Sequence, residues 1–160
     1  MNKKKRINKE HLFLLTTGAV CLAFMAFTTM LFPAVKLAYS SYSTEVSGLH
    51  AVFGGTVANV QLAPQKYNFN IISLIGYILP LVAVILGILA FKKEGIILNY
   101  VAAILCLVAT IIMFLEPTIF TLFNEVNPNY SVSILFGPVV GGILALISGV
   151  LNLGCVKLKG

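Results

Sequence analysis

The feature that most constrains the fold is the last long apolar run of the chain, from Val132 to Gly154. It carries no charged residue over 23 positions, and a helix of that length, rising about 1.5 Å per residue, crosses the ~30 Å hydrocarbon layer of a bilayer. Small residues recur at every fourth position within it, at Gly137, Gly141, Ala145 and Gly149. This spacing places them on one helix face, where another backbone can approach closely. The run therefore predicts a membrane-spanning helix on which the other helices pack.

Three further apolar runs have similar length, and with the last one they predict spans at about residues 12–32, 71–91, 96–115 and 132–154. Of the 160 residues, 59% are hydrophobic and only 10% are charged, whereas a soluble domain has about 25% charged residues. Such a chain has too few polar groups to cover a surface that faces water. We therefore expect an all-α integral membrane protein, a single four-helix bundle over residues 1–160.

The positive charges are distributed unevenly about these spans. Nine of the 11 Lys and Arg residues flank the spans on one side: Lys3, Lys4, Lys5, Arg6, Lys9, Lys92, Lys93, Lys157 and Lys159. Since cationic loops stay in the cytoplasm, we expect residues 1–11, 92–95 and 155–160 to be cytoplasmic, in a multi-pass protein of the cell membrane. The outer loops are then residues 33–70 and 116–131. Topology already explains the net charge of +6, so no nucleic-acid partner is expected.

The other spans also carry small residues at helical spacing. These pairs are Ala19 and Ala23 in the first span, Ala83 and Gly87 in the second, and Ala102 and Cys106 in the third. They predict faces for helix packing, against a second span or against another protein. Pro80 lies inside the second span, where it removes one backbone hydrogen bond and is expected to bend the helix.

The first outer loop predicts a small antiparallel β-sheet. Short runs with strand composition occupy residues 39–46, 49–53 and 56–62. Ser47-Gly48 separates the first two runs, and Gly54-Gly55 separates the second two. Because glycine supplies the positive φ that tight hairpin turns need, we expect a three-stranded meander with turns at Gly48 and at Gly54-Gly55.

The residues needed for catalysis are scarce. The chain contains no Asp, and its two histidines, His11 and His50, are predicted to lie on opposite sides of the membrane. No cluster with metal-ligand spacing and no phosphate-binding loop occurs. No acidic residue lies within the predicted spans, since Glu116 is at a helix end, and Asn99 is expected to be a satisfied amide at the cytoplasmic interface. We expect neither an enzyme nor a bound cofactor or metal.

Four spans, cytoplasmic termini, and a longer first outer loop with a small sheet resemble the claudin-type tetraspan arrangement. The local similarity lies at Ser47-Gly48-Leu49-His50, where that family has Gly-Leu-Trp followed by two cysteines. This chain departs from the pattern, with His50 in place of the Trp and no cysteine in either outer loop. The resemblance implies a left-handed four-helix bundle that supports an outer sheet used for contact with other proteins.

Three hypotheses about function follow. The first is a non-catalytic interaction, scaffold or accessory protein that uses the outer sheet and the small-residue helix faces. Its partners would be the lipid bilayer and another membrane or surface protein, including a second copy of the chain. The second is an oligomeric channel or transporter for small molecules, gated at Pro80. The third is an immunity protein against a membrane-active peptide.

Overall fold

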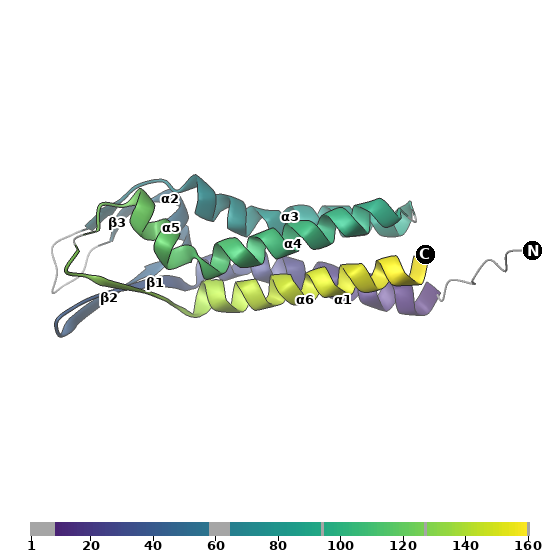
Figure 1. Cartoon of the computed structure of the whole chain (residues 1–160), viewed down its shortest axis with the longest axis horizontal. Coiled ribbons are helices and arrows are strands. Elements are labelled where there is room, and N and C mark those ends of the chain that lie inside the picture. The colour runs from purple at the N-terminus through teal and green to yellow at the C-terminus, as the bar shows by residue number, and fades with distance from the viewer. Residues whose placement is uncertain (1–8, 58–64, 94, 127, 160) are drawn as a thin grey trace, which may run out of the picture.

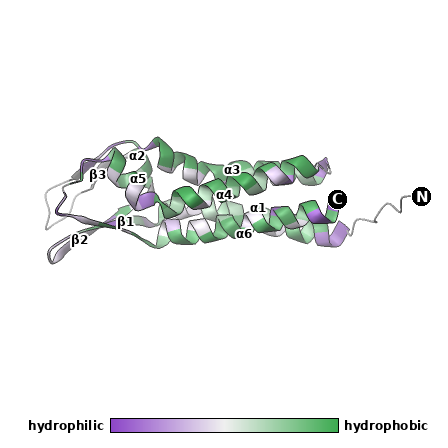
Figure 2. Ribbon diagram, in the orientation of Figure 1, coloured by the Kyte–Doolittle hydropathy of each residue, from purple (hydrophilic) through white to green (hydrophobic). Residues whose placement is uncertain are grey.

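The computed structural model describes residues 9–57, 65–93, 95–126 and 128–159. Within these ranges four helices are long and apolar enough to cross a membrane. They are α1 (Lys9–Thr28), extended by the 3₁₀ turn η1 (Thr29–Leu31), α3 (Ile71–Lys92), α4 (Ile96–Phe114) and α6 (Phe136–Lys159). They lie side by side as an elongated bundle (Figure 1), and Figure 2 shows hydrophobic residues along their length. The predicted all-α fold of a multi-pass membrane protein is confirmed.

The bundle is a ring in which each helix has two main neighbours. Helix α1 packs on α3 and α6, and α4 packs on the same two helices. The prediction that all other spans pack on the last one is therefore wrong for α3, which lies diagonally across the ring from α6. Helices α3 and α4 are neighbours, as the short connection between them requires.

Three of the helices begin and end within three residues of the predicted spans, and the last one does not. Residues 131–134 form strand β5 (Ser131–Ile134) instead of the start of a helix, and α6 begins at Phe136 and continues to Lys159. The reason is the alternation of Ser and aliphatic residues from Ser131 to Ile134, which has the period of a strand and not of a helix. Helix α3 runs unbroken from Ile71 through the buried Pro80 to Lys92.

All the strands and short helices gather at one end of the bundle, here called the sheet end (Figure 1). Helix α1 begins and α6 ends at the opposite end, here called the terminal end. The elements of the sheet end are β1 (Pro33–Tyr39), β2 (Tyr42–Ser47), α2 (Gly48–Phe53), β3 (Gly55–Val57), β4 (Gln65–Tyr67), α5 (Glu116–Phe123) and β5. Among the described residues, β2, β1 and β5 form one antiparallel sheet in that order, and β3 pairs with β4.

A sheet is present, but the predicted meander within the first loop is wrong. Residues 48–53 form α2, because the hydroxyl of Ser47 accepts a hydrogen bond from the backbone N–H of His50 and so begins a helix where a turn was expected. The hairpin turn is Ser40-Ser41, and Ser40 has a φ of 52°. Of the third predicted strand, residues 58–62 lie outside the described residues.

The third strand of the sheet comes from the second loop. Strand β5 pairs antiparallel with β1 and places Ser133 opposite Lys36, and Val132 opposite Leu37. A further backbone hydrogen bond, from Leu135 N to Ala34 O at 2.9 Å, extends this pairing toward the bundle. The two predicted outer loops therefore form one folded unit.

Two glycines allow backbones to meet where α1 leads into β1. A Cβ on Gly48 would lie 2.6 Å from Met30 O, and a Cβ on Gly137 would lie 2.9 Å from Pro33 O and 3.0 Å from Thr29 O. These neighbours are backbone atoms, which cannot rotate away. The segment from Thr29 to Ala34, here called the pivot, is therefore held between α2 and α6.

We predict that Gly137→Ala destabilises the protein by about 1–3 kcal/mol, since the added methyl group forces the pivot and α6 apart. The matched control is Gly154→Ala on the same helix, where the nearest atom is Leu15 Cδ1 at 3.2 Å, the far end of a flexible side chain. We expect this control variant to lose less than about 0.5 kcal/mol of stability. Thermal unfolding of both variants in the same detergent compares them, and equal losses would contradict the prediction.

Candidate functional site at the sheet end

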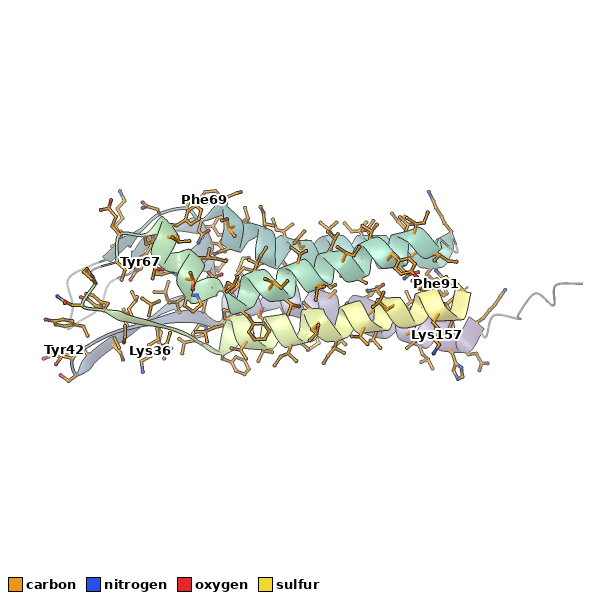
Figure 3. The ribbon with its side chains drawn as sticks, viewed as in Figure 1. Lys36, Tyr42, Tyr67, Phe69, Phe91 and Lys157 are labelled. Carbon is orange, nitrogen blue, oxygen red and sulfur yellow. The ribbon has the colours of Figure 1, made fainter. Side chains whose placement is uncertain are left out.

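Three pairs of exposed phenylalanines mark the two ends of the apolar surface. They are Phe32–Phe136 and Phe53–Phe69 at the sheet end and Phe13–Phe91 at the terminal end, with ring centroids 6.0, 6.4 and 6.0 Å apart. Figure 3 shows Phe69 and Phe91 at opposite ends of the bundle. Phe13 and Phe32 are 19 residues apart, about 28 Å along a helix, which matches the hydrocarbon thickness. Aromatic belts of this kind sit at the interfaces of a membrane.

Beyond this belt projects the hairpin of β1 and β2, whose tip is rich in tyrosine and serine. Tyr39 and Tyr42 flank the turn Ser40-Ser41, and both rings remain exposed, at 43% and 44%. Tyr130 lies against Tyr39 with ring centroids 5.3 Å apart, although it is distant in sequence. Figure 3 shows Tyr42 at the far end of the molecule. We call Tyr39, Tyr42 and Tyr130, with the serine turn, the tyrosine tip.

A separate hydrophobic core supports the tip. Val35 and Leu37 of β1 and Val46 of β2 are fully buried and cluster with Phe120 of α5. Tyr67 of β4 completes the cluster, with its ring centroid 5.2 Å from that of Phe120. Burial and the nearby Tyr130 raise the pKa of Tyr67 to about 12, so this phenol stays neutral. The hairpin is thus a rigid projection held on α5 and not a free loop.

Asn124 connects the two loops through hydrogen bonds. Its Oδ1 accepts from the backbone N–H of Asn68 at 2.7 Å, and its Nδ2 donates to Phe120 O at 2.9 Å. Asn68 Nδ2 in turn donates to Phe123 O at 3.0 Å. Asn124 is buried, and its bond to Asn68 holds the end of α5 against the segment that follows β4 and leads into α3.

Below the sheet core lies a buried polar cluster, which we call the Glu116 site. Glu116, the first residue of α5, is fully buried, and Ser73 Oγ of α3 donates a hydrogen bond to its Oε1 at 2.8 Å. Tyr77 lies on the same face of α3 as Ser73, and both Tyr77 and Asn70, the residue before α3, are also fully buried. Asn70 caps α3, since its Oδ1 accepts from the backbone N–H groups of Ile72 and Ser73.

Sequence reasoning missed this site because it placed Glu116 at a helix end, outside the spans, and did not consider that the side chain is buried there. The signal was the helical spacing of Met113, Glu116 and Phe120, in which the acid shares the face of two large apolar residues. Met113 and Phe120 are both fully buried, and so is the acid between them.

A second buried polar cluster lies at the terminal end. Asn99 Nδ2 of α4 donates to Asn152 Oδ1 of α6 at 3.1 Å, and Asn152 Nδ2 donates to Ser148 O at 3.0 Å. Lys159 Nζ donates to Asn99 Oδ1 and to Ala90 O, each at 2.8 Å. This cluster joins α3, α4 and α6 and satisfies the amide of Asn99 within the protein.

The predicted small-residue faces lie inside the bundle. Gly141 approaches the Thr29 hydroxyl and Met113, Ala145 packs with Ala26 and Ala109, and Gly149 faces Ala103 O and Cys106. Ala83, Ala102 and Cys106 form one buried cluster, Gly87 faces Val20, and Ala19 and Ala23 are buried. These faces are therefore used within the chain and are not available to a partner. The expectation that they bind another protein is wrong.

The glycines expected at hairpin turns have other roles. Gly48 begins α2 against the pivot, and Gly54 ends α2 with a φ of 72°. Gly55, with a φ of 121°, begins β3. His50 Nδ1 lies 2.9 Å from Ser47 Oγ, so this histidine supports the start of α2. In the described ranges no group of three or more His, Cys, Asp or Glu residues is placed to hold a metal ion.

Comparisons of the chain with models of protein families, with curated proteins and with solved structures find no match. The claudin resemblance therefore stays a prediction.

We predict that Asn124→Ala loosens the sheet end, because it leaves the backbone N–H of Asn68 without its partner at a cost of about 1–3 kcal/mol. Hydrogen exchange followed by mass spectrometry should show faster exchange of the amides of α5 and β1, with the amides of α4 unchanged. The control is Glu125→Ala at the next residue, which is exposed. Unchanged exchange in the Asn124 variant would contradict the role assigned to this side chain.

Proposed function

We propose that this protein is a non-catalytic interaction or accessory protein of the cell membrane that binds a partner protein through the tyrosine tip. The observation that carries the proposal is the projection of two exposed tyrosines beyond the aromatic belt, on a hairpin fixed by its own core. The small-residue helix faces are buried in the bundle, which leaves the lipid-facing surface and the sheet end for contacts.

The chemistry of the tip suits protein recognition. Tyrosine offers a large, rigid ring with one hydrogen-bonding group, and binding surfaces are enriched in it. Serines beside it add adaptable hydrogen bonds at little cost in volume. Because the hairpin is already held by Phe120 and Tyr130, little conformational entropy is lost when a partner binds.

The distribution of charge favours an outward-facing tip. The terminal end carries the cationic residues Lys9, Lys92, Lys93, Lys157 and Lys159, whereas Lys36 and Lys66 belong to the sheet end. By the positive-inside rule the terminal end is cytoplasmic and the tip lies outside the cell. The partner is then a membrane or surface protein, or a second copy of this chain.

The other two hypotheses have less support. A channel gated at Pro80 would need a polar path along the bundle, and the described middle of the interior consists largely of buried small residues such as Ala26, Ala109 and Ala145. The immunity hypothesis stays a prediction from size and topology alone.

A photo-crosslinking amino acid placed at position 42 tests the proposal in the native cells. We expect a discrete, light-dependent adduct whose partner is identified by mass spectrometry, and we expect Tyr39→Ala in the same chain to reduce its yield at least several-fold. The matched control carries the same amino acid at Thr118, an exposed position of α5 at the same end. No adduct at position 42, or the same adducts at both positions, would overturn the proposal.

A further inference from the structure

A fully buried acid at the edge of a membrane bundle is costly to keep ionised. The carboxyl group of Glu116 is 0% exposed and receives one hydrogen bond, from Ser73 Oγ to Oε1. Its second oxygen, Oε2, has no hydrogen-bond partner among the described residues. A carboxylate normally accepts several hydrogen bonds, so this site is poorly suited to a permanent negative charge.

Near Glu116 lie other buried polar atoms that lack a hydrogen-bond partner within the described ranges, which indicates a site that can take up and release a proton. Asn70 Nδ2 and Tyr77 Oη are buried and, like Glu116 Oε2, lack a hydrogen-bond partner in the described part of the chain. Tyr77 shares one face of α3 with Ser73, four residues earlier, and Asn70 caps the helix by accepting from the backbone N–H of Ser73. Native proteins pair nearly all such groups, and a cluster of exceptions beside an acid points to a functional role.

No described residue that faces the Glu116 site carries a fixed positive charge. Helix α5 packs on α3, α4, β1 and β5. On these elements the titratable groups near it are Tyr77 of α3 and Lys36 of β1. Lys36 alternates with the buried Val35 and Leu37, so its side chain points to the opposite face of the sheet from Phe120. Tyr67 reaches the same core and is neutral. Tyr100 and Cys106 of α4 lie ten or more residues before Glu116, about 15 Å or more along the helix.

We propose that Glu116 is a proton-binding site, in which Oε2 takes up and releases a proton while Oε1 keeps its hydrogen bond from Ser73. In the release step the O–H bond of the carboxyl group breaks, the proton passes to water, and the carboxylate keeps the electron pair. The inference does not depend on the binding of a partner protein by the tyrosine tip.

The electrostatics agree with this assignment. Burial raises the pKa of Glu116 to about 7, against the opposing effect of the Ser73 hydrogen bond, which stabilises the ionised form. The site therefore changes its protonation within the physiological range, where an ordinary glutamate stays ionised. Because the folded pKa lies above the unfolded one, this group stabilises the fold most at pH below 4.5 and loses that contribution as pH rises through 7.

We expect protons to reach the site from the sheet end. Toward the terminal end, the hydroxyl of Thr110 is already bonded to the backbone carbonyls of Cys106 and Gly142, and that of Ser148 to the carbonyl of Ala19. Ala26, Ala109 and Ala145 fill the interior at mid-height. Among the described residues these contacts favour exchange of protons with one side of the membrane only.

Ionisation has a mechanical consequence, because Glu116 is the first residue of α5. The Ser73–Glu116 hydrogen bond joins α5 to α3, and Phe120 of α5 supports the sheet. Charging a buried acid draws water toward it and weakens the packing around it. We therefore expect the amides of α5 to exchange faster at pH 8 than at pH 6, after correction for the intrinsic pH dependence of exchange.

Infrared difference spectroscopy of the full-length protein in lipid nanodiscs tests the assignment directly. Titration from pH 5 to pH 9 should show a protonated carboxyl band that disappears with a midpoint near 7 and is absent in Glu116→Gln. Glu125→Gln, at an exposed acid, should leave this band unchanged. Ser73→Ala should shift the midpoint to higher pH, because it removes the hydrogen bond that favours the carboxylate.

A midpoint below about 5.5 would overturn the proposal, because solvated glutamates have pKa values in that range. A band that survives in Glu116→Gln would also overturn it. If Glu116→Gln does not fold, Ser73→Ala decides alone: an unshifted or lowered midpoint contradicts the proposal. The tyrosine-tip function fails separately, since an absent adduct at position 42 has no bearing on this titration.

Discussion

The sheet end depends on the close approach of backbones at the pivot, residues 29–34. Gly137 of α6 and Gly48 of α2 press against its carbonyl groups from two sides, and Gly48 N donates a hydrogen bond to Phe32 O at 2.9 Å. In a membrane, an apolar side chain gains little free energy when it exchanges lipid tails for apolar protein groups. Close backbone contacts of this kind therefore determine the positions of the helices. By fixing where β1 leaves the membrane, the pivot also fixes β2 and β5, which pair with β1 on its two edges.

The interior is divided along the length of the bundle. Small residues fill its middle, where the buried hydroxyl groups of Thr110 and Ser148 are bonded to backbone carbonyls, and larger buried polar side chains lie at the two ends, where they are differently satisfied. At the terminal end, Lys159, Asn99 and Asn152 bond one another and the backbone, so that cluster is closed. At the sheet end, Glu116, Tyr77 and Asn70 each keep an atom without a hydrogen-bond partner in the described part of the chain. The polar groups at the terminal end are thus satisfied within the protein, whereas those at the sheet end, on the side of the tyrosine tip, include the carboxyl group of Glu116, which can bind a proton.

The sequence predicted the elements that depend on local interactions and missed those that depend on contacts between distant residues. Length and hydropathy predicted the membrane-spanning helices, because a helix satisfies its own backbone and each span is a separate pattern. The sheet was expected in the wrong place, since pairing of β1 with β5 joins residues about 95 positions apart and leaves no mark at short range. Gly48 was taken for a turn residue because glycine suits a turn and a close contact equally, and only the neighbouring Met30 decides between them. The burial of Glu116 was missed because it depends on how α5 packs against α3, which no local pattern records.

The most direct test of this architecture is a disulfide between the two loops, in a chain whose three native cysteines are replaced by alanine. Lys36 and Ser133 are paired across β1 and β5, so cysteines there have the spacing that a disulfide requires. Glu45 of β2 pairs with Lys36 on the opposite edge of β1. Glu45 is therefore two strands, or about 10 Å, from Ser133, which is too far for a disulfide. Mild oxidation in membranes should therefore cross-link Lys36→Cys with Ser133→Cys and leave Glu45→Cys with Ser133→Cys reduced. Failure of the first pair to form, or equal cross-linking of both, would contradict a sheet built from the two loops.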